Sequence, residues 1–299
     1  MMTDQAKAYI FALISVLLWS TVASAFKISL RYLSPVELLF YAACFSCCVL
    51  FIVLALQKKL HLLVKADAGV WKTSLLFGLL SPFLYYLVLL KAYDLLPAQQ
   101  AQPLNYTWAI TLSLLSVPLL GHRLKLLEIV AVLVSYLGVL VISTQGDVLS
   151  LKFENPFGVA LALGSTLIWA LYWIFNTKDR RDPVLGLFLN FFCSLPFIGF
   201  YLLVTEGFRS IDRAGVFGAA YIGTFEMGIA FISWLMAMKL TKSTARIANL
   251  IFISPFLSLF LIHFFVGEKI LISSVVGLIF IVAGLIIQAV AGRTGRGDG

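Results

Sequence analysis

Residues 119–142 read LLGHRLKLLEIVAVLVSYLGVLVI, and residues 265–287 read FVGEKILISSVVGLIFIVAGLII, 146 positions further on. Each stretch places a glycine-containing polar turn before a long apolar run. A second pair of similar stretches, LLWSTVASAF around Trp19 and LIWALYWIF around Trp169, is offset by 150 positions. The alternative is chance similarity between apolar segments, but two landmarks at nearly equal offsets favour an internal duplication.

The duplicated unit contains five apolar segments, and a helix needs about 20 apolar residues to cross a bilayer. Because five is odd, the second copy enters the membrane from the other side. We therefore predict an all-α integral membrane fold of ten transmembrane helices arranged as two inverted five-helix repeats, with a substrate site near mid-membrane where the halves meet. The predicted spans are 8–26, 36–56, 73–93, 98–120, 127–143, 157–176, 184–205, 215–238, 245–266 and 271–291.

Composition supports a membrane protein. The 299 residues are 61% hydrophobic and 12% charged, whereas soluble domains are about 25% charged. The net charge of +8 could suggest nucleic acid. However, the basic residues lie in short clusters between apolar blocks, which is the pattern that orients membrane helices.

The distribution of Lys and Arg predicts the orientation. With the N-terminus inside, fifteen of these residues fall in cytoplasmic segments and seven in external ones. This excess predicts that both termini are cytoplasmic. The N-terminal stretch has no small-residue cleavage site, so it is expected to be a retained first span. Ser34-Pro35, Asn155-Pro156 and Asp182-Pro183 each predict a helix start, with a capping residue before a proline.

No cofactor or metal is expected. All four cysteines, at positions 44, 47, 48 and 193, lie inside apolar blocks. They lack a nearby histidine or acidic partner to complete a metal site. They are interpreted as small buried hydrophobic residues.

The chain resembles the drug/metabolite transporter superfamily, EamA type. The resemblance rests on the Trp19-Ser20 pair, the Gly-basic and Gly-acidic turns before the fifth and tenth helices, and the duplicated plan. It covers nearly the whole chain and implies transport of small metabolites, often amino-acid export, without an ATPase module. It also implies that residues 1–145 and 146–299 are two EamA-type five-helix repeats.

The fourth segment is similar to that of the aromatic amino-acid exporters in the same superfamily. Those proteins carry an Asn-Tyr-x-Trp-Pro run, and Asn105, Tyr106 and Trp108 match it. Ala109 stands where the exporters have proline. The amide and the two polar-tipped aromatics need partners in an apolar setting. They could bind a substrate, or they could hydrogen-bond neighbouring helices.

Glu226 is the candidate at the centre of the site. It is the one acidic residue in TFEMGIAFISWLMAM, residues 224–238, and lies near the middle of its predicted span. An ionised carboxylate at that depth costs about 2.5–3.5 kcal/mol on insertion scales. We expect it to face a cavity, where it could exchange a proton or hold a substrate's positive charge. The alternative is a structural carboxyl bonded to a neighbouring helix.

Aromatic residues are candidates to wall the same cavity. Trp19 and Trp169 lie about twelve residues into their helices, too deep for an interfacial belt. Tyr85 joins them, with further aromatics at positions 86, 172, 173 and 234. Such walls favour a cationic or zwitterionic, partly apolar substrate.

Two further polar residues, Asn249 and His263, lie fourteen positions apart on the ninth segment, roughly on one face. His263 could be a proton relay, although a histidine satisfied by helix packing is the commoner case.

These observations predict a secondary transporter of the bacterial inner membrane. Its partners are the lipid bilayer and a small-molecule metabolite, not nucleic acid, and proton coupling and a homodimer stay open. Amino-acid or related metabolite export by alternating access is the first hypothesis. Import or exchange of a vitamin, nucleoside or cationic metabolite is the second. An intramembrane lipid enzyme is disfavoured, because no nucleophile–base pair or metal-ligand set accompanies the three histidines.

Overall fold

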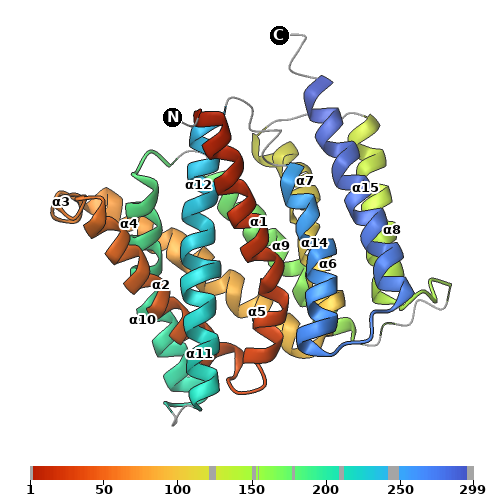
Figure 1. Cartoon of the computed structure of the whole chain (residues 1–299), viewed down its shortest axis with the longest axis horizontal. Coiled ribbons are helices and arrows are strands. Elements are labelled where there is room, and N and C mark those ends of the chain that lie inside the picture. The colour runs from red at the N-terminus through yellow and green to blue at the C-terminus, as the bar shows by residue number, and fades with distance from the viewer. Residues whose placement is uncertain are drawn as a thin grey trace.

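The computed structural model describes residues 3–120, 126–149, 153, 155–176, 179–208, 212–241 and 249–294. Within these ranges all regular structure is helical. The helices stand side by side, with the N-terminal end of α1 and the C-terminal end of α15 at the same end of the bundle (Figure 1). We call this end the terminal side and the other end the opposite side.

Residues before position 145 form the first group of helices. They are α1 (Asp4–Ser29), α2 (Pro35–Leu56), α3 (His61–Val64), α4 (Ala68–Gly78), the kinked segment η1 (Leu79–Leu84), α5 (Tyr85–Leu95), α6 (Ala98–Tyr106), α7 (Trp108–Leu120) and α8 (Leu126–Ser143).

Residues after position 155 form the second group. They are α9 (Pro156–Asn176), α10 (Pro183–Thr205), α11 (Arg213–Tyr221), the π-helical turn η2 (Ile222–Ala230), α12 (Phe231–Leu240), the short 3₁₀ helix η3 (Asn249–Ile253), α14 (Ser254–Leu261), η4 (Ile262–Val266) and α15 (Ile272–Thr294).

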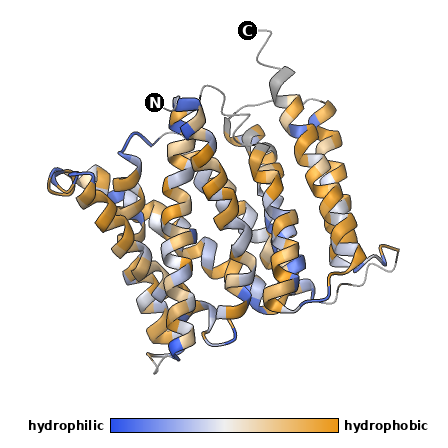
Figure 2. Cartoon of the chain, in the orientation of Figure 1, coloured by the Kyte–Doolittle hydropathy of each residue, from blue (hydrophilic) through white to orange (hydrophobic). Residues whose placement is uncertain are grey.

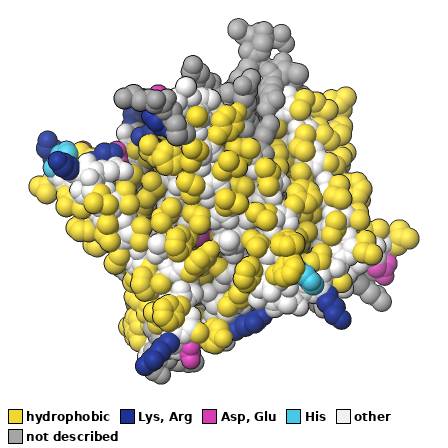
Figure 3. All heavy atoms as spheres, viewed as in Figure 1, with side chains coloured by type: hydrophobic (Ala, Val, Ile, Leu, Met, Phe, Trp, Pro, Cys, Tyr) yellow, Lys and Arg dark blue, Asp and Glu magenta, His cyan; other side chains and the backbone are white. Residues whose placement is uncertain are grey.

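The described residues contain eight helices long and apolar enough to cross a membrane, and a shorter apolar helix at Leu250–Val266. Apolar residues cover the sides of these helices, and hydrophilic residues concentrate near their ends (Figure 2). On the visible face, a broad apolar surface separates charged side chains near its two ends (Figure 3). This is the surface of a multi-pass membrane protein.

The predicted span 98–120 is not one continuous helix, which corrects the sequence-based prediction. It breaks at Thr107 into α6 and α7. The Thr107 hydroxyl donates to the carbonyl of Leu104 at 2.7 Å, and the Thr107 backbone N–H bonds the same carbonyl at 3.2 Å. This i−3 pattern tightens the turn and competes with continuation of the α-helix.

All three proline-marked helix starts are confirmed. Ser34 forms a capping box with Glu37: the Ser34 hydroxyl accepts from the Glu37 N–H, and the Glu37 carboxylate accepts from the Ser34 N–H. The Asn155 side chain accepts from the N–H of Gly158 at 2.8 Å. The Asp182 carboxylate accepts from the N–H groups of the second and third residues of α10. Each cap satisfies backbone donors that a helix start leaves free.

Helices α8 and α15 pack against each other along one edge of the bundle (Figure 1). A Cβ atom at Gly138 would meet the side chain of Ile281, and one at Gly284 would meet the side chain of Ser135. Adding the sequence offset of 146 to positions 138 and 135 gives positions 284 and 281. The Gly138–Ile281 contact and the Ser135–Gly284 contact are therefore equivalent under this offset. Partner positions descend along α15 as they ascend along α8, so the pair is antiparallel.

Candidate functional site

A cavity of about 230 Å³ lies in the middle of the bundle. Its wall is formed by residues of α1, α5, α6, α7, α9, η2 and α12 together with η3. Seven of the nine predicted site residues line it: Trp19, Tyr85, Asn105, Tyr106, Trp108, Trp169 and Glu226. The structure therefore brings both halves of the sequence to one place, while the transport role of these residues stays a prediction.

Glu226 lies in η2, and its side chain faces the cavity. The residue is only 7% exposed. Its Oε1 accepts a hydrogen bond of 2.7 Å from the hydroxyl of Tyr86, and its Oε2 has no hydrogen-bond partner among the described residues. A buried carboxylate oxygen without a donor is costly. Oε2 of Glu226 is therefore a candidate to accept a hydrogen bond from a ligand cation or to take up a proton.

A π-helical turn and a kink accompany the Tyr86–Glu226 pair. Glu226 lies inside the π-helical turn η2. Tyr86 is the second residue of α5, which follows η1, and η1 is kinked at Ser81, where the backbone is not helical. Gly223 allows η2 to approach α2 closely, because a Cβ atom there would overlap the backbone oxygen of Ala42. π-Helical turns in α-helices occur frequently at functional sites.

Asn105 and Tyr106 hold helices together, which favours one of the two roles weighed for them. The Asn105 amide donates to Ser165 of α9 at 2.9 Å, and the Tyr106 hydroxyl donates to Ser254 of α14 at 2.8 Å. The Tyr85 hydroxyl approaches the Asn105 oxygen at 3.4 Å. These polar tips already have partners, so they position the cavity wall.

Stacked and edge-on aromatic rings form the rest of the wall. Tyr85 and Trp169 stack with ring centroids 4.5 Å apart, and Trp169 continues onto Tyr172 at 5.4 Å. Trp19 lies 5.3 Å from Trp234 and is edge-on to Phe231 at 6.0 Å. Trp19 and Trp169 thus lie in the cavity wall, as predicted. Ring faces of this kind suit apolar groups and cations.

Two further polar groups line the cavity: Gln102, which was not predicted from the sequence, and Trp173, which was predicted among the further aromatic residues of the wall. Within the described part of the chain the Gln102 Oε1 and the Trp173 Nε1 have no hydrogen-bond partner. The signal for Gln102 was present in the sequence, since QQAQ at residues 99–102 is unusually polar for a membrane span. Together with the Glu226 Oε2, the described residues of the cavity offer two acceptors and one donor without a partner among them.

The two predicted residues of the ninth segment are not part of this cavity wall as described. His263 is exposed in η4, where its Nδ1 lies 3.0 Å from the carbonyl oxygen of Glu268. The side chain of Asn249 lies outside the described residues. His263 therefore does not line the central cavity, and its role as a proton relay stays a prediction.

Side-chain hydrogen bonds close the opposite side, one set within the first half and one set between the two halves. Lys27 at the end of α1 donates to the carbonyls of Tyr93 and Leu96, both at 2.7 Å, at the C-terminal end of α5. The Glu268 carboxylate accepts from the N–H groups of Ala98 and Gln99 at the start of α6. Lys27 thus caps a helix end, a role that its interfacial position alone did not predict.

Similar proteins are named as transporters. A protein from Bacillus subtilis, named uncharacterized transporter YvbV, is 25% identical over 276 residues, which cover 90% of this chain and 87% of that protein. An uncharacterized transporter from Archaeoglobus fulgidus is 23% identical over 94% of this chain and 98% of its own length. An uncharacterized transporter from Clostridium kluyveri is 28% identical, but the match spans 57% of this chain and 56% of that protein.

A solved crystal structure of another protein has the same fold, with a TM-score of 0.67 and 21% identity. The match covers 98% of this chain and 99% of that one. The family model for EamA-like transporters matches the chain twice, over residues 6–144 and 156–289. The chain belongs to the EamA-like transporter family.

Proposed function

We propose that this chain is a secondary transporter of small zwitterionic metabolites, with amino acids as the first candidates, and that it exports them by alternating access. The free Glu226 Oε2 in the central cavity is the observation that carries this proposal. A carboxylate in an apolar, enclosed setting pairs with a cation or takes up a proton. An ammonium group supplies both positive charge and hydrogen-bond donors.

The remaining free groups support a substrate with a second polar end. The Trp173 indole N–H is a donor, so it suits a carboxylate or carbonyl oxygen. The Gln102 Oε1 is an acceptor, so it suits another ammonium proton. The rings of Tyr85 and Trp169 provide an apolar wall for a side chain. An α-amino acid carries all three kinds of group.

The proposed cycle rocks residues 1–145 against residues 146–299 around this cavity. Symmetric contacts between α8 and α15 support a pivot at that helix pair. The terminal side is assigned to the cytoplasm of the inner (plasma) membrane, on the basis of the Lys and Arg distribution. A reporter fused to the C-terminus tests this orientation, because activity of a reporter enzyme that works only in the periplasm would contradict it.

Transport assays in proteoliposomes test the function. Radiolabelled amino acids are offered one at a time to wild type, Glu226→Gln and Glu206→Gln. Glu206 follows α10 and does not line the cavity, so it is the matched control. We expect flux of at least one amino acid in wild type and Glu206→Gln, and loss of that flux in Glu226→Gln. Absence of flux for every amino acid would refute the proposal.

A second candidate is a carrier of cationic metabolites. Among the described residues that line the central cavity, Glu226 is the only acidic one and none is basic. An amine without a carboxylate would satisfy Glu226 and leave the Trp173 N–H free. Faster flux of amines than of the matching amino acids in the same proteoliposomes would favour this candidate.

A further inference from the structure

A second cavity, of about 190 Å³, lies toward the terminal side of the bundle. It shares Trp173, Phe231 and Trp234 with the central cavity, so these three rings form a partition between the two spaces. The second cavity is more polar than the central one on the far side of the partition, where Asp179, Arg181 and other polar side chains line it. We call this space the inner vestibule.

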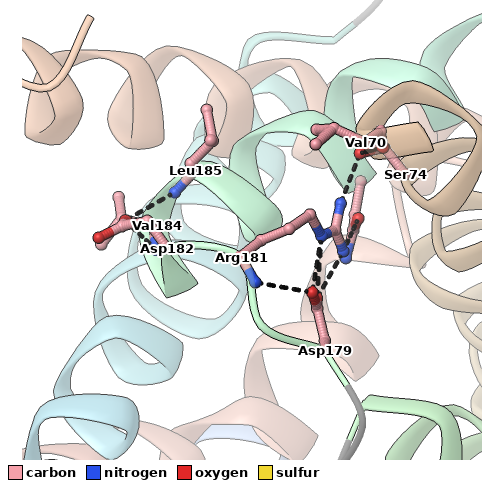
Figure 4. A network of polar contacts seen from close by, with 8 residues as sticks. Val70, Ser74, Asp179, Arg181, Asp182, Val184 and Leu185 are labelled. Atoms are coloured by element: carbon pink, nitrogen blue, oxygen red, sulfur yellow. Dashed lines mark hydrogen bonds and ion pairs between the residues drawn. The ribbon is translucent and has the colours of Figure 1, made fainter. Parts of the chain in front are cut away.

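Arg181 is the cationic group of the inner vestibule. Its side chain is only 8% exposed, and its guanidinium carbon lies 5.2 Å from the ring centre of Phe77. The guanidinium donates to the carboxylate of Asp179, to the hydroxyl of Ser74 and to the amide oxygen of Asn190. Figure 4 shows Asp179 and Ser74 on two sides of this group. A buried arginine needs such partners to offset its desolvation.

The partners of Arg181 differ in kind. Ser74 and Asn190 belong to helices α4 and α10, and both are neutral. Asp179 belongs to the connection between α9 and α10, and it accepts from Arg181 through both carboxylate oxygens, with the contact between Nη2 and Oδ2 at 2.7 Å. A planar guanidinium presents a two-pronged donor that matches any carboxylate. Asp179 therefore occupies the position that a substrate carboxylate would fill.

We propose that the inner vestibule is a second substrate subsite, where Arg181 exchanges the carboxylate of Asp179 for that of a ligand. This inference rests on the proposed transport of carboxylate-bearing substrates. The exchange keeps the charge at Arg181 balanced, and Ser74 and Asn190 hold the guanidinium during it. A ligand bound there has its apolar part against Trp173, Phe231 and Trp234, one partition away from Glu226.

Ligands that carry one charged group each separate the two subsites. The full-length protein in lipid nanodiscs is titrated with 3-phenylpropionate, which has only the carboxylate, and with phenethylamine, which has only the ammonium. Tryptophan fluorescence reports binding, because Trp173 and Trp234 border both cavities. The variants are Arg181→Gln, Asp179→Asn, the double variant, and Arg180→Gln as the control, since Arg180 is exposed and does not line the inner vestibule.

We expect Arg181→Gln and the double variant to weaken 3-phenylpropionate binding about tenfold or more, as for loss of a charge-assisted pair. Asp179→Asn is expected to tighten it, because the competing carboxylate is gone. Arg180→Gln should match wild type, and phenethylamine should bind wild type, Arg180→Gln and the double variant equally, because the double variant removes both charges together. The double variant keeps the test valid if Arg181→Gln alone leaves Asp179 unpaired and unfolds the protein.

Unchanged 3-phenylpropionate binding in the double variant would overturn the inference, as would an equal loss in Arg180→Gln. The proposed function fails separately, through the absence of Glu226-dependent flux. Arg181-dependent binding without such flux would support an anion subsite in a carrier of another substrate class.

Discussion

Helices α8 and α15 pack so closely that adding one methyl group at a contact glycine should push them apart. Gly284→Ala places a Cβ atom 2.6 Å from the backbone oxygen of Ala131 and 3.0 Å from the backbone nitrogen of Ser135. Ordinary contacts begin at 3.4 Å, so the helices must part by roughly 0.8 Å, which is 3.4 minus 2.6. A gap of that size forfeits about a quarter to a half of the dispersion energy of the contacts it opens.

We expect Gly284→Ala to cost about 1–3 kcal/mol, the usual range for overpacking. Gly138→Ala is expected to cost a similar amount, because its Cβ atom would overlap the backbone of Gly277. Gly164→Ala in α9 is the control, since no atom of a neighbouring element in the described ranges lies within 4 Å of its added Cβ. Alanine is the better helix former by about 1 kcal/mol, so the control should be unchanged or more stable.

Thermal unfolding of the three purified variants in one detergent measures these differences. The expected order of melting temperature is Gly164→Ala at or above wild type, with Gly138→Ala and Gly284→Ala below it. If Gly284→Ala melted with wild type, the close antiparallel approach of α8 and α15 would be refuted. A loss confined to one of the two glycines would contradict the symmetric relation between them.

Three further predictions concern individual side chains. Trp173→Phe keeps a ring but removes the free N–H. It should raise the KM for transport of an amino acid and leave the KM for the corresponding amine unchanged, with both KM values taken from flux measurements. An equal change in both KM values would contradict the role assigned to Trp173. Lys27→Met removes the donor to two α5 carbonyls, so cysteine labelling near the opposite side should become faster, and an unchanged rate would count against this closure. Burial alone would raise the pKa of Asp182, but hydrogen bonds from Lys59 and from the start of α10 hold the pKa below its ordinary value. A carboxyl whose pKa is depressed in the folded state stabilises the fold at pH above its unfolded pKa of about 3.9, and this stabilisation is lost as the pH falls through the folded pKa. The melting temperature of Asp182→Asn should therefore depend less on pH in the acid range than that of wild type. The same pH dependence in the variant as in wild type would refute the prediction.

The features that the sequence predicted well are those set by local chemistry. Hydropathy located the eight long apolar helices and the shorter one at Leu250–Val266 among the described residues, because the bilayer demands long apolar helices. Ser34, Asn155 and Asp182 marked helix starts, because each cap depends only on residues two or three positions away. The depth of Glu226 followed from its position in a long apolar segment, and the structure places it in a cavity wall.

The features that were missed depend on tertiary contacts. Tyr86 and Glu226 are 140 positions apart, and no local pattern pairs them. Lys27 and Arg181 resemble ordinary interfacial cations in the sequence, yet their hydrogen bonds reach carbonyls and side chains of distant helices. The break at Thr107 depends on a hydroxyl that competes for a backbone carbonyl, and hydropathy does not detect that competition.

The central claim is that the Glu226 carboxylate holds the proton or the substrate during transport, and flux driven by a pH gradient tests it most directly. Proteoliposomes containing wild type, Glu226→Gln or Glu206→Gln are loaded with the amino acid that wild type transports best, and efflux is followed with and without the gradient. The account predicts that Glu226→Gln is present in the membrane in normal amount but has lost efflux, while Glu206→Gln equals wild type. Efflux at the wild-type rate in Glu226→Gln would show that this carboxylate holds neither the proton nor the substrate.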